Sequence, residues 1–127
     1  MKTVEDFVAT LSPHERNILS YMDKAVGNHA IPAFILLDEQ VVETNMMVAV
    51  LWTMHNPKAF RVALDTVGDY EISTVFLTAP HGTDGKEHFE TMVTWPGRTR
   101  MYRSHTLKGA KIGHEAIVNR LREGGLP

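Results

Sequence analysis

The sequence predicts an α+β fold: a small antiparallel β-sheet meander, with N-terminal helices and a C-terminal helix packed on it. Helical apolar spacing is confined to the two ends and one short middle segment, whereas residues 60–104 alternate as strands do. Strands that follow one another without intervening helices pair antiparallel, which favours this class over an alternating α/β fold. The 127 residues suit a single domain, with a helical segment 1–30 and a β-rich core 31–127.

The N-terminal segment is expected to form two short helices, or one helix with a break at Ser12. The first has the i, i+3, i+4, i+7 spacing of one apolar face, at Val4, Phe7, Val8 and Leu11. The second begins with Ser12, Pro13 and Glu15 in the positions of a capping box. The apolar side chains of this segment exceed what a small sheet needs. We therefore expect it to anchor a homo-oligomer.

A hairpin and a short helix are expected next. Residues 33–37 and 40–43 are β-rich runs on either side of a polar two-residue turn. The helix then begins at Thr44 or Asn45 and ends before Pro57, because a residue that precedes proline is pushed out of the helical region. Its apolar side chains fit either the core or an oligomer contact.

The centre of the chain is expected to be a meander of four strands, at residues 60–67, 70–77, 88–95 and 98–104. Gly68-Asp69 suits a type II′ turn and Pro96-Gly97 a type II turn, with a polar loop at 78–87 between the two hairpins. Thr106 is the expected N-cap of a last helix over residues 107–122.

Composition excludes several classes of function. A net charge of −2 argues against a general DNA-binding domain, which is usually strongly basic. The absence of cysteine excludes a disulfide framework, an iron–sulfur cluster and a thiol nucleophile. The start of the sequence lacks the apolar run of a signal peptide, and the longest apolar stretch, residues 46–52, is too short to cross a bilayer. We expect a cytoplasmic protein that binds neither DNA nor membrane and carries no cofactor.

One set of residues has metal-ligand chemistry. His88 and Glu90 lie two apart on a predicted strand, so their side chains share a face. With His81 from the preceding loop they could form the site of a small metal-dependent hydrolase. The alternative, which we favour, is a polar stripe on a half-exposed sheet. His114 cannot begin a metallopeptidase motif because position 118 is Val118, so it is expected to hydrogen-bond across to the sheet.

An anion site is predicted at three arginines, Arg98, Arg100 and Arg103, with Lys108 and Lys111 at the start of the last helix. Guanidinium groups bind phosphate oxygens in pairs, and the backbone amides of a helix N-terminus favour anions. The alternative is a solvated edge strand, where basic side chains deter aggregation.

Aromatic side chains near these arginines could stack on a base, with Trp95 and Tyr102 close to the turn and Phe89 one strand back. The alternative is that they belong to the core. The candidate ligand-binding residues are therefore Arg98, Arg100, Arg103, Trp95, Tyr102, Phe89 and His81. No catalytic motif accompanies them, so a non-enzymatic protein is expected.

Three separated blocks resemble a family of small proteins that is widespread in phage and prophage genomes. They are Ser73-Thr74-Val75-Phe76-Leu77 followed by His81-Gly82, then Phe89-Glu90-Thr91-Met92-Val93, then Arg103, Thr106, Ala110 and Gly113-His114. The resemblance covers residues 60–118, about half of the chain. The chain departs from the pattern at Thr78, where the family has glycine, and at Ser104, where it has tyrosine.

The architecture is also similar, more loosely, to phage anti-Thoeris sponges, which are oligomers that sequester cyclic ADP-ribose signals. This resemblance implies an anti-defence protein in the host cytoplasm, which would bind a cyclic ADP-ribose isomer or a cyclic oligonucleotide without cleaving it. Two alternatives stay open: the small metal-dependent hydrolase, and a phage protein that binds and inhibits a host protein.

Overall fold

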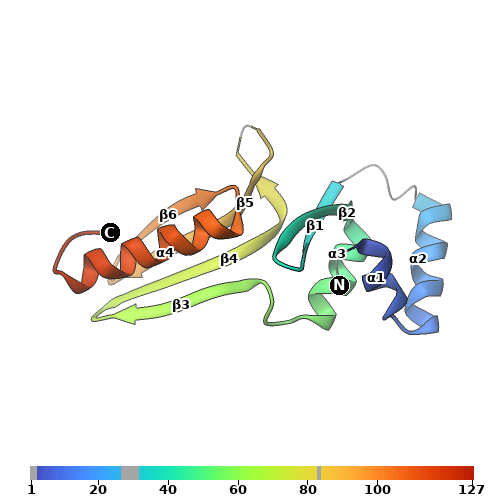
Figure 1. Cartoon of the computed structure of the whole chain (residues 1–127), viewed down its shortest axis with the longest axis horizontal. Coiled ribbons are helices and arrows are strands. Elements are labelled where there is room, and N and C mark those ends of the chain that lie inside the picture. Colours follow the sequence, from blue (N-terminus) through green and yellow to red (C-terminus); the bar gives the residue numbers. More distant parts are fainter. Residues whose placement is uncertain (1–2, 27–31, 83) are drawn as a thin grey trace. The chain divides into compact units, whose positions relative to one another are not determined.

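The computed structural model describes residues 3–26, 32–82 and 84–127, with the backbone alone at 23–26 and 81, and it confirms the α+β class (Figure 1). These residues form four helices and two antiparallel sheets, of two and four strands. They group into two compact units, Met1–Pro57 and Lys58–Pro127, which we call the N-terminal and C-terminal units. The two-stranded hairpin thus groups with the N-terminal helices. That the two units act as one domain stays a prediction.

The N-terminal unit contains α1 (Val4–Ala9), α2 (Pro13–Val26), β1 (Pro32–Leu37), β2 (Gln40–Asn45) and α3 (Met46–His55). Reciprocal side-chain caps start both α1 and α2. The Ser12 N–H donates to Glu15 Oε1 at 3.0 Å, and the Glu15 N–H donates to Ser12 Oγ at 3.1 Å. The predicted capping box is therefore confirmed. Thr3 and Asp6 make the same exchange at the start of α1.

The β1–β2 hairpin turns through two residues with left-handed backbone. Asp38 has φ 50° and Glu39 has φ 63°, which is the type I′ geometry that matches the twist of paired strands. Along β1, Ala33, Ile35 and Leu37 are buried. Their alternation gives the hairpin one apolar face, and α3 packs on β1.

Asn45 begins α3, because its side-chain oxygen accepts a hydrogen bond of 3.0 Å from the Val48 N–H. Of the two predicted caps, Asn45 and Thr44, the structure selects Asn45. The helix ends at Asn56, as expected from the proline that follows. One side of the helix is buried, at Val48, Ala49, Leu51 and Trp52.

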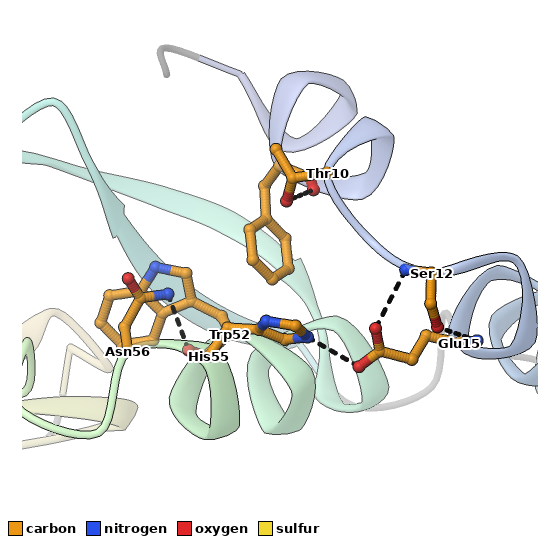
Figure 2. Close-up of polar contacts among 7 residues, drawn as sticks. Thr10, Ser12, Glu15, Trp52, His55 and Asn56 are labelled. Atoms are coloured by element: carbon orange, nitrogen blue, oxygen red, sulfur yellow. Dashed lines mark hydrogen bonds and ion pairs between the residues drawn. The ribbon is translucent and has the colours of Figure 1, made fainter.

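His55, at the end of α3, contacts both of the N-terminal helices, α1 and α2. Its Nε2 lies 2.7 Å from Glu15 Oε2, so the cap of α2 and the last turn of α3 share one carboxylate (Figure 2). The His55 ring also meets the buried Phe7 edge to face, with ring centroids 6.2 Å apart. The Ser12 N–H and then His55 lower the pKa of Glu15 below its ordinary value.

The apolar face predicted for the N-terminal segment divides into two parts. Phe7 and Leu11 are buried within the unit's own core. Val4 and Val8 instead line an open groove of about 520 Å³. The other residues that line it are Glu5, Ala9, Leu19, Ser20, Asn45 and Val48. That this segment anchors an oligomer stays a prediction.

The C-terminal unit contains β3 (Arg61–Val67), β4 (Tyr70–His81), β5 (Glu87–Trp95), β6 (Arg98–Ser104) and α4 (Leu107–Arg122). Its strands pair in chain order, as the sequence predicts. Gly68, with φ 57°, and Gly97, with φ 75°, take the left-handed positions of the two tight turns. The predicted loop 78–87 is too long, because β4 continues to His81 and β5 begins at Glu87, with an irregular register after Phe76.

α4 lies over one face of the four-stranded sheet, which we call the inner face (Figure 1). A core forms there from Ile72, Val93, Ile117, Val118 and Leu121. The opposite face, the outer face, carries the alternate residues of each strand. In the described part of the chain, no helix is long and apolar enough to cross a membrane.

Candidate functional site

A chain of hydrogen bonds runs through the middle of the C-terminal unit, from α4 across three strands. His114 Nδ1 lies 2.7 Å from Thr74 Oγ1, and His114 Nε2 lies 2.7 Å from Asp65 Oδ2. Thr74 Oγ1 lies 2.6 Å from Thr91 Oγ1. His114, Thr74 and Thr91 are buried, whereas the Asp65 side chain is 38% exposed. The buried network therefore has one end in solvent.

The donors and acceptors of this network can all be satisfied. An ionised Asp65 only accepts, so Nε2 of His114 must carry a proton. In the neutral ring Nδ1 then accepts from the Thr74 hydroxyl, which in turn accepts from Thr91. In the charged ring both hydroxyls reverse direction. Either charge state leaves Thr74 hydrogen-bonded on both sides, which explains how three polar groups can be buried in a core.

The order Asp65–His114–Thr74 matches the acid, base and hydroxyl of a hydrolase triad. A nucleophile must reach its substrate, but Thr74 is fully buried, with 0% of its surface exposed. Its hydroxyl is also held by His114 and Thr91 together. The arrangement therefore fastens α4 to the sheet, the structural role predicted for His114.

The three sequence blocks on which the predicted resemblance depends meet in this network. The first contributes Thr74, the second Thr91 and the third His114. Arg103 also reaches Glu90 of the second block, with Nε 3.4 Å from Oε2. Sequence reasoning missed Asp65, although its inward position on β3, opposite Ile72, gave the available signal.

The arginines that the sequence groups together lie on two faces. Arg98 pairs with Trp95 and Arg100 with Val93, so both follow the inner face. Arg103 pairs with Glu90 on the outer face, where the two form the ion pair already described. Alternate residues of a strand point to opposite faces, so two of the three predicted arginines share the inner face.

The start of α4 does not contribute to the same site. β6 runs from Arg98 to Ser104, so α4, with Lys108 in its first turn, begins at the far end of the strand. The end of the chain returns to the near end, where Arg100 Nη1 donates a hydrogen bond of 2.8 Å to the Pro127 carbonyl. The basic residues in the last turn of α4 are Arg120 and Arg122.

The predicted aromatic residues also separate. Trp95 and Tyr102 are half-buried, pack against the core of the unit and share the face of Arg98 and Arg100. Tyr70 lies beside Trp95, with ring centroids 5.4 Å apart. Phe89 is fully buried against Phe76, which fits the alternative that it belongs to the core.

Two of the three predicted metal ligands, His88 and Glu90, have described side chains. Glu90 is paired with Arg103, and His88 is buried on the outer side of β5. In the backbone His81 pairs with Glu87, but its side chain lies outside the described residues. Among the described residues, no three histidine, aspartate or glutamate side chains are grouped so as to hold a metal ion. A site that includes His81 stays a prediction.

Acidic and basic groups surround His88 nevertheless. His105 Nε2 lies 3.0 Å from Asp84 Oδ2 at this end of the sheet. Burial lowers the pKa of His88, and the nearby His105 lowers it further, while Asp84 acts in the opposite direction. The Lys86 N–H and His105 lower the pKa of Asp84.

No family model, curated protein or solved structure matches this chain. The resemblance to phage proteins therefore stays a prediction, and the function must be inferred from the chain's own residues.

Proposed function

We propose that this chain is a non-catalytic binding protein that holds a phosphorylated nucleotide at the Arg98 end of its C-terminal unit. The observation that supports it most is the register of β6. Because Arg98 pairs with Trp95 and Arg100 with Val93, both guanidinium groups belong to the face that carries Trp95 and Tyr102.

These two arginines suit a ligand with more than one phosphate group. Alternate residues of a strand are about 6.8 Å apart, so two guanidinium groups on one face can bind neighbouring phosphates of one molecule. Arg120 and Arg122 add positive charge at the same end, against Glu123 after α4 and Asp69 in the β3–β4 turn. A half-buried Trp95 offers a base a rigid surface, and such stacking contributes about 1–3 kcal/mol.

Binding without cleavage is supported by the Asp65–His114–Thr74 network. It is the arrangement among the described residues that most resembles a catalytic triad, and its hydroxyl is closed to solvent. With the resemblance to phage sponges, we propose that the ligand is a cyclic ADP-ribose isomer or a cyclic oligonucleotide. The protein would sequester this immune signal in the host cytoplasm.

Titration calorimetry with a panel of these nucleotides tests the proposal. Arg100→Ala should lose a charge-assisted contact of about 1.5–3 kcal/mol, which weakens binding roughly tenfold to more than a hundredfold. Arg103→Ala is the matched control, because Arg103 lies on the other face in an ion pair with Glu90. It should bind as tightly as the wild type.

Heating the complex and recovering the nucleotide separates binding from catalysis. A sponge returns the ligand intact, whereas a hydrolase returns a product. If the wild type binds no nucleotide of the panel, the proposal is wrong. If Arg100→Ala and Arg103→Ala bind equally well, the nucleotide site lies elsewhere.

A further inference from the structure

A row of three apolar side chains and one serine crosses the outer face of the four-stranded sheet. The strand register aligns Leu64, Ser73, Met92 and Met101, one from each of β3, β4, β5 and β6. Leu64 is 46% exposed, Met92 37% and Met101 52%. α4 covers the inner face, and within the C-terminal unit no described helix or strand lies over this row. An exposed row of this kind marks a contact surface.

Charged residues flank the row differently on its two sides. One side carries Arg61, Glu90 and Arg103 across the strands. Since Glu90 neutralises Arg103, this side has a net charge of +1. The other side carries Thr66, Glu71, Thr94 and Thr99, with a net charge of −1.

We propose that the outer face binds a second copy of this chain about a two-fold axis that runs along the Leu64–Met101 row. Such an axis turns each copy over and exchanges the two sides of the row. The apolar row of one copy then meets that of the other, and the Arg61 side of each copy lies over the Glu71 side of its partner. This surface is self-complementary in both apolar contact and charge, as a two-fold interface requires.

The size of the outer face sets the expected affinity of the dimer. Four strands and about six residues of each give a footprint of roughly 19 Å by 20 Å, or about 400 Å² before the relief of the side chains is counted. Counted on both copies this is about 800 Å², which is below the roughly 1,200–2,000 Å² of standard interfaces and in the range of weak, transient ones. A reversible dimer that dissociates in the micromolar range is therefore expected, not a permanent one.

Sedimentation velocity of the full chain, at about 1 to 500 µM, measures this equilibrium. The wild type should pass from 14.3 kDa monomer to dimer as concentration rises. Met92→Glu and Met101→Glu should each raise the dissociation constant at least about tenfold, because each buries a charge in the apolar row. Ile112→Glu is the control: Ile112 is 61% exposed on α4, so its replacement should leave the dimer unchanged.

A pair of charge reversals tests the two-fold arrangement. Glu71→Arg and Arg61→Glu should each weaken the dimer, because each places like charges across the interface. The double variant restores opposite charges between copies and should recover dimerisation.

The proposal is wrong if the wild type stays monomeric over the whole range, or if Met92→Glu and Met101→Glu variants with native circular dichroism dimerise as the wild type does. Failure of the double reversal to recover the dimer would exclude the two-fold axis along the row. The Arg98 site lies on the inner face, so nucleotide binding by Met92→Glu keeps the test of the proposed function separate.

Discussion

His114 Nδ1 lies 2.7 Å from the hydroxyl of Thr74, forty residues earlier in the chain, and neither group reaches solvent. A buried hydrogen bond between two side chains stabilises a fold modestly while it is made, but a buried group left without its partner costs far more. The Thr74–His114 contact therefore fixes the rotation of α4 on the sheet, because any other rotation would leave the buried Nδ1 of His114 without this partner.

Removal of the Thr74 hydroxyl should destabilise the fold. Thr74→Val keeps the shape but leaves Nδ1 of His114 and the Thr91 hydroxyl without a partner, at a cost of about 1–3 kcal/mol. Urea denaturation measures this loss as a lower midpoint with an unchanged slope. Thr99→Val, on the exposed part of β6, is the matched control and should change stability by less than about 0.5 kcal/mol.

A double-mutant cycle with His114→Phe shows whether the two residues act together. The coupling energy between Thr74→Val and His114→Phe should be about 0.5–3 kcal/mol. Each single variant leaves the other buried group without its hydrogen-bond partner, and the double variant removes that group as well. Additive losses would mean that the contact between Thr74 and His114 does not stabilise the fold.

Most of the secondary structure follows from local signals in the sequence. The capping box at Ser12 and Glu15, the cap at Thr106 and the glycine turns at Gly68 and Gly97 each depend on a few neighbouring residues, and the structure contains all of them. Strand alternation also puts Thr74 on the same face as Ile72, and both residues are buried. Such features need no knowledge of distant contacts.

The candidate site depends on register and topology, which local signals do not supply. Arg103 was added to Arg98 and Arg100 as part of a local charge cluster, and adding Lys108 assumed that the start of α4 lies near the turn before β6. Asp65 was missed because its partner, His114, is 49 residues away. The contact between Asp65 and His114 could be placed only once α4 was known to lie over this face of the sheet.

In the N-terminal unit, His55→Ala should loosen α1 and α2. The variant loses both the 2.7 Å contact with Glu15 and the edge-to-face contact with Phe7. The pKa of Glu15, measured by carboxyl NMR titration, should rise towards its ordinary value, because His55 is one of the groups that lower it. Amide exchange in α1 should quicken. Met54→Ala, one residue away on the exposed side of α3, should change neither quantity.

Chelation tests the metal-dependent alternative. If His81, His88 and Glu90 held a metal ion in the native protein, its binding energy would be part of the folding energy. We expect the melting temperature to stay the same in excess EDTA, and added zinc to leave it unchanged. If EDTA instead lowers the melting temperature of the wild type sharply but not that of the His81→Ala variant, the result favours the hydrolase over the sponge.

The last prediction concerns His88 and the pH dependence of stability. Burial, and then His105, lower the pKa of His88 in the folded protein below its ordinary value of 6.5. Above pH 6.5 the ring is neutral in both states, so it contributes no pH dependence. As the pH falls below 6.5 the unfolded chain binds a proton that the folded chain does not, and stability declines until the folded pKa is reached.

His88→Gln should remove this part of the decline. Urea denaturation at several pH values on either side of 6.5 gives the slope of the unfolding free energy against pH for the wild type and the variant. The contributions of the other histidines cancel in the comparison, because both proteins contain them. Equal slopes for the two proteins would mean that the His88 ring is hydrated in the folded state.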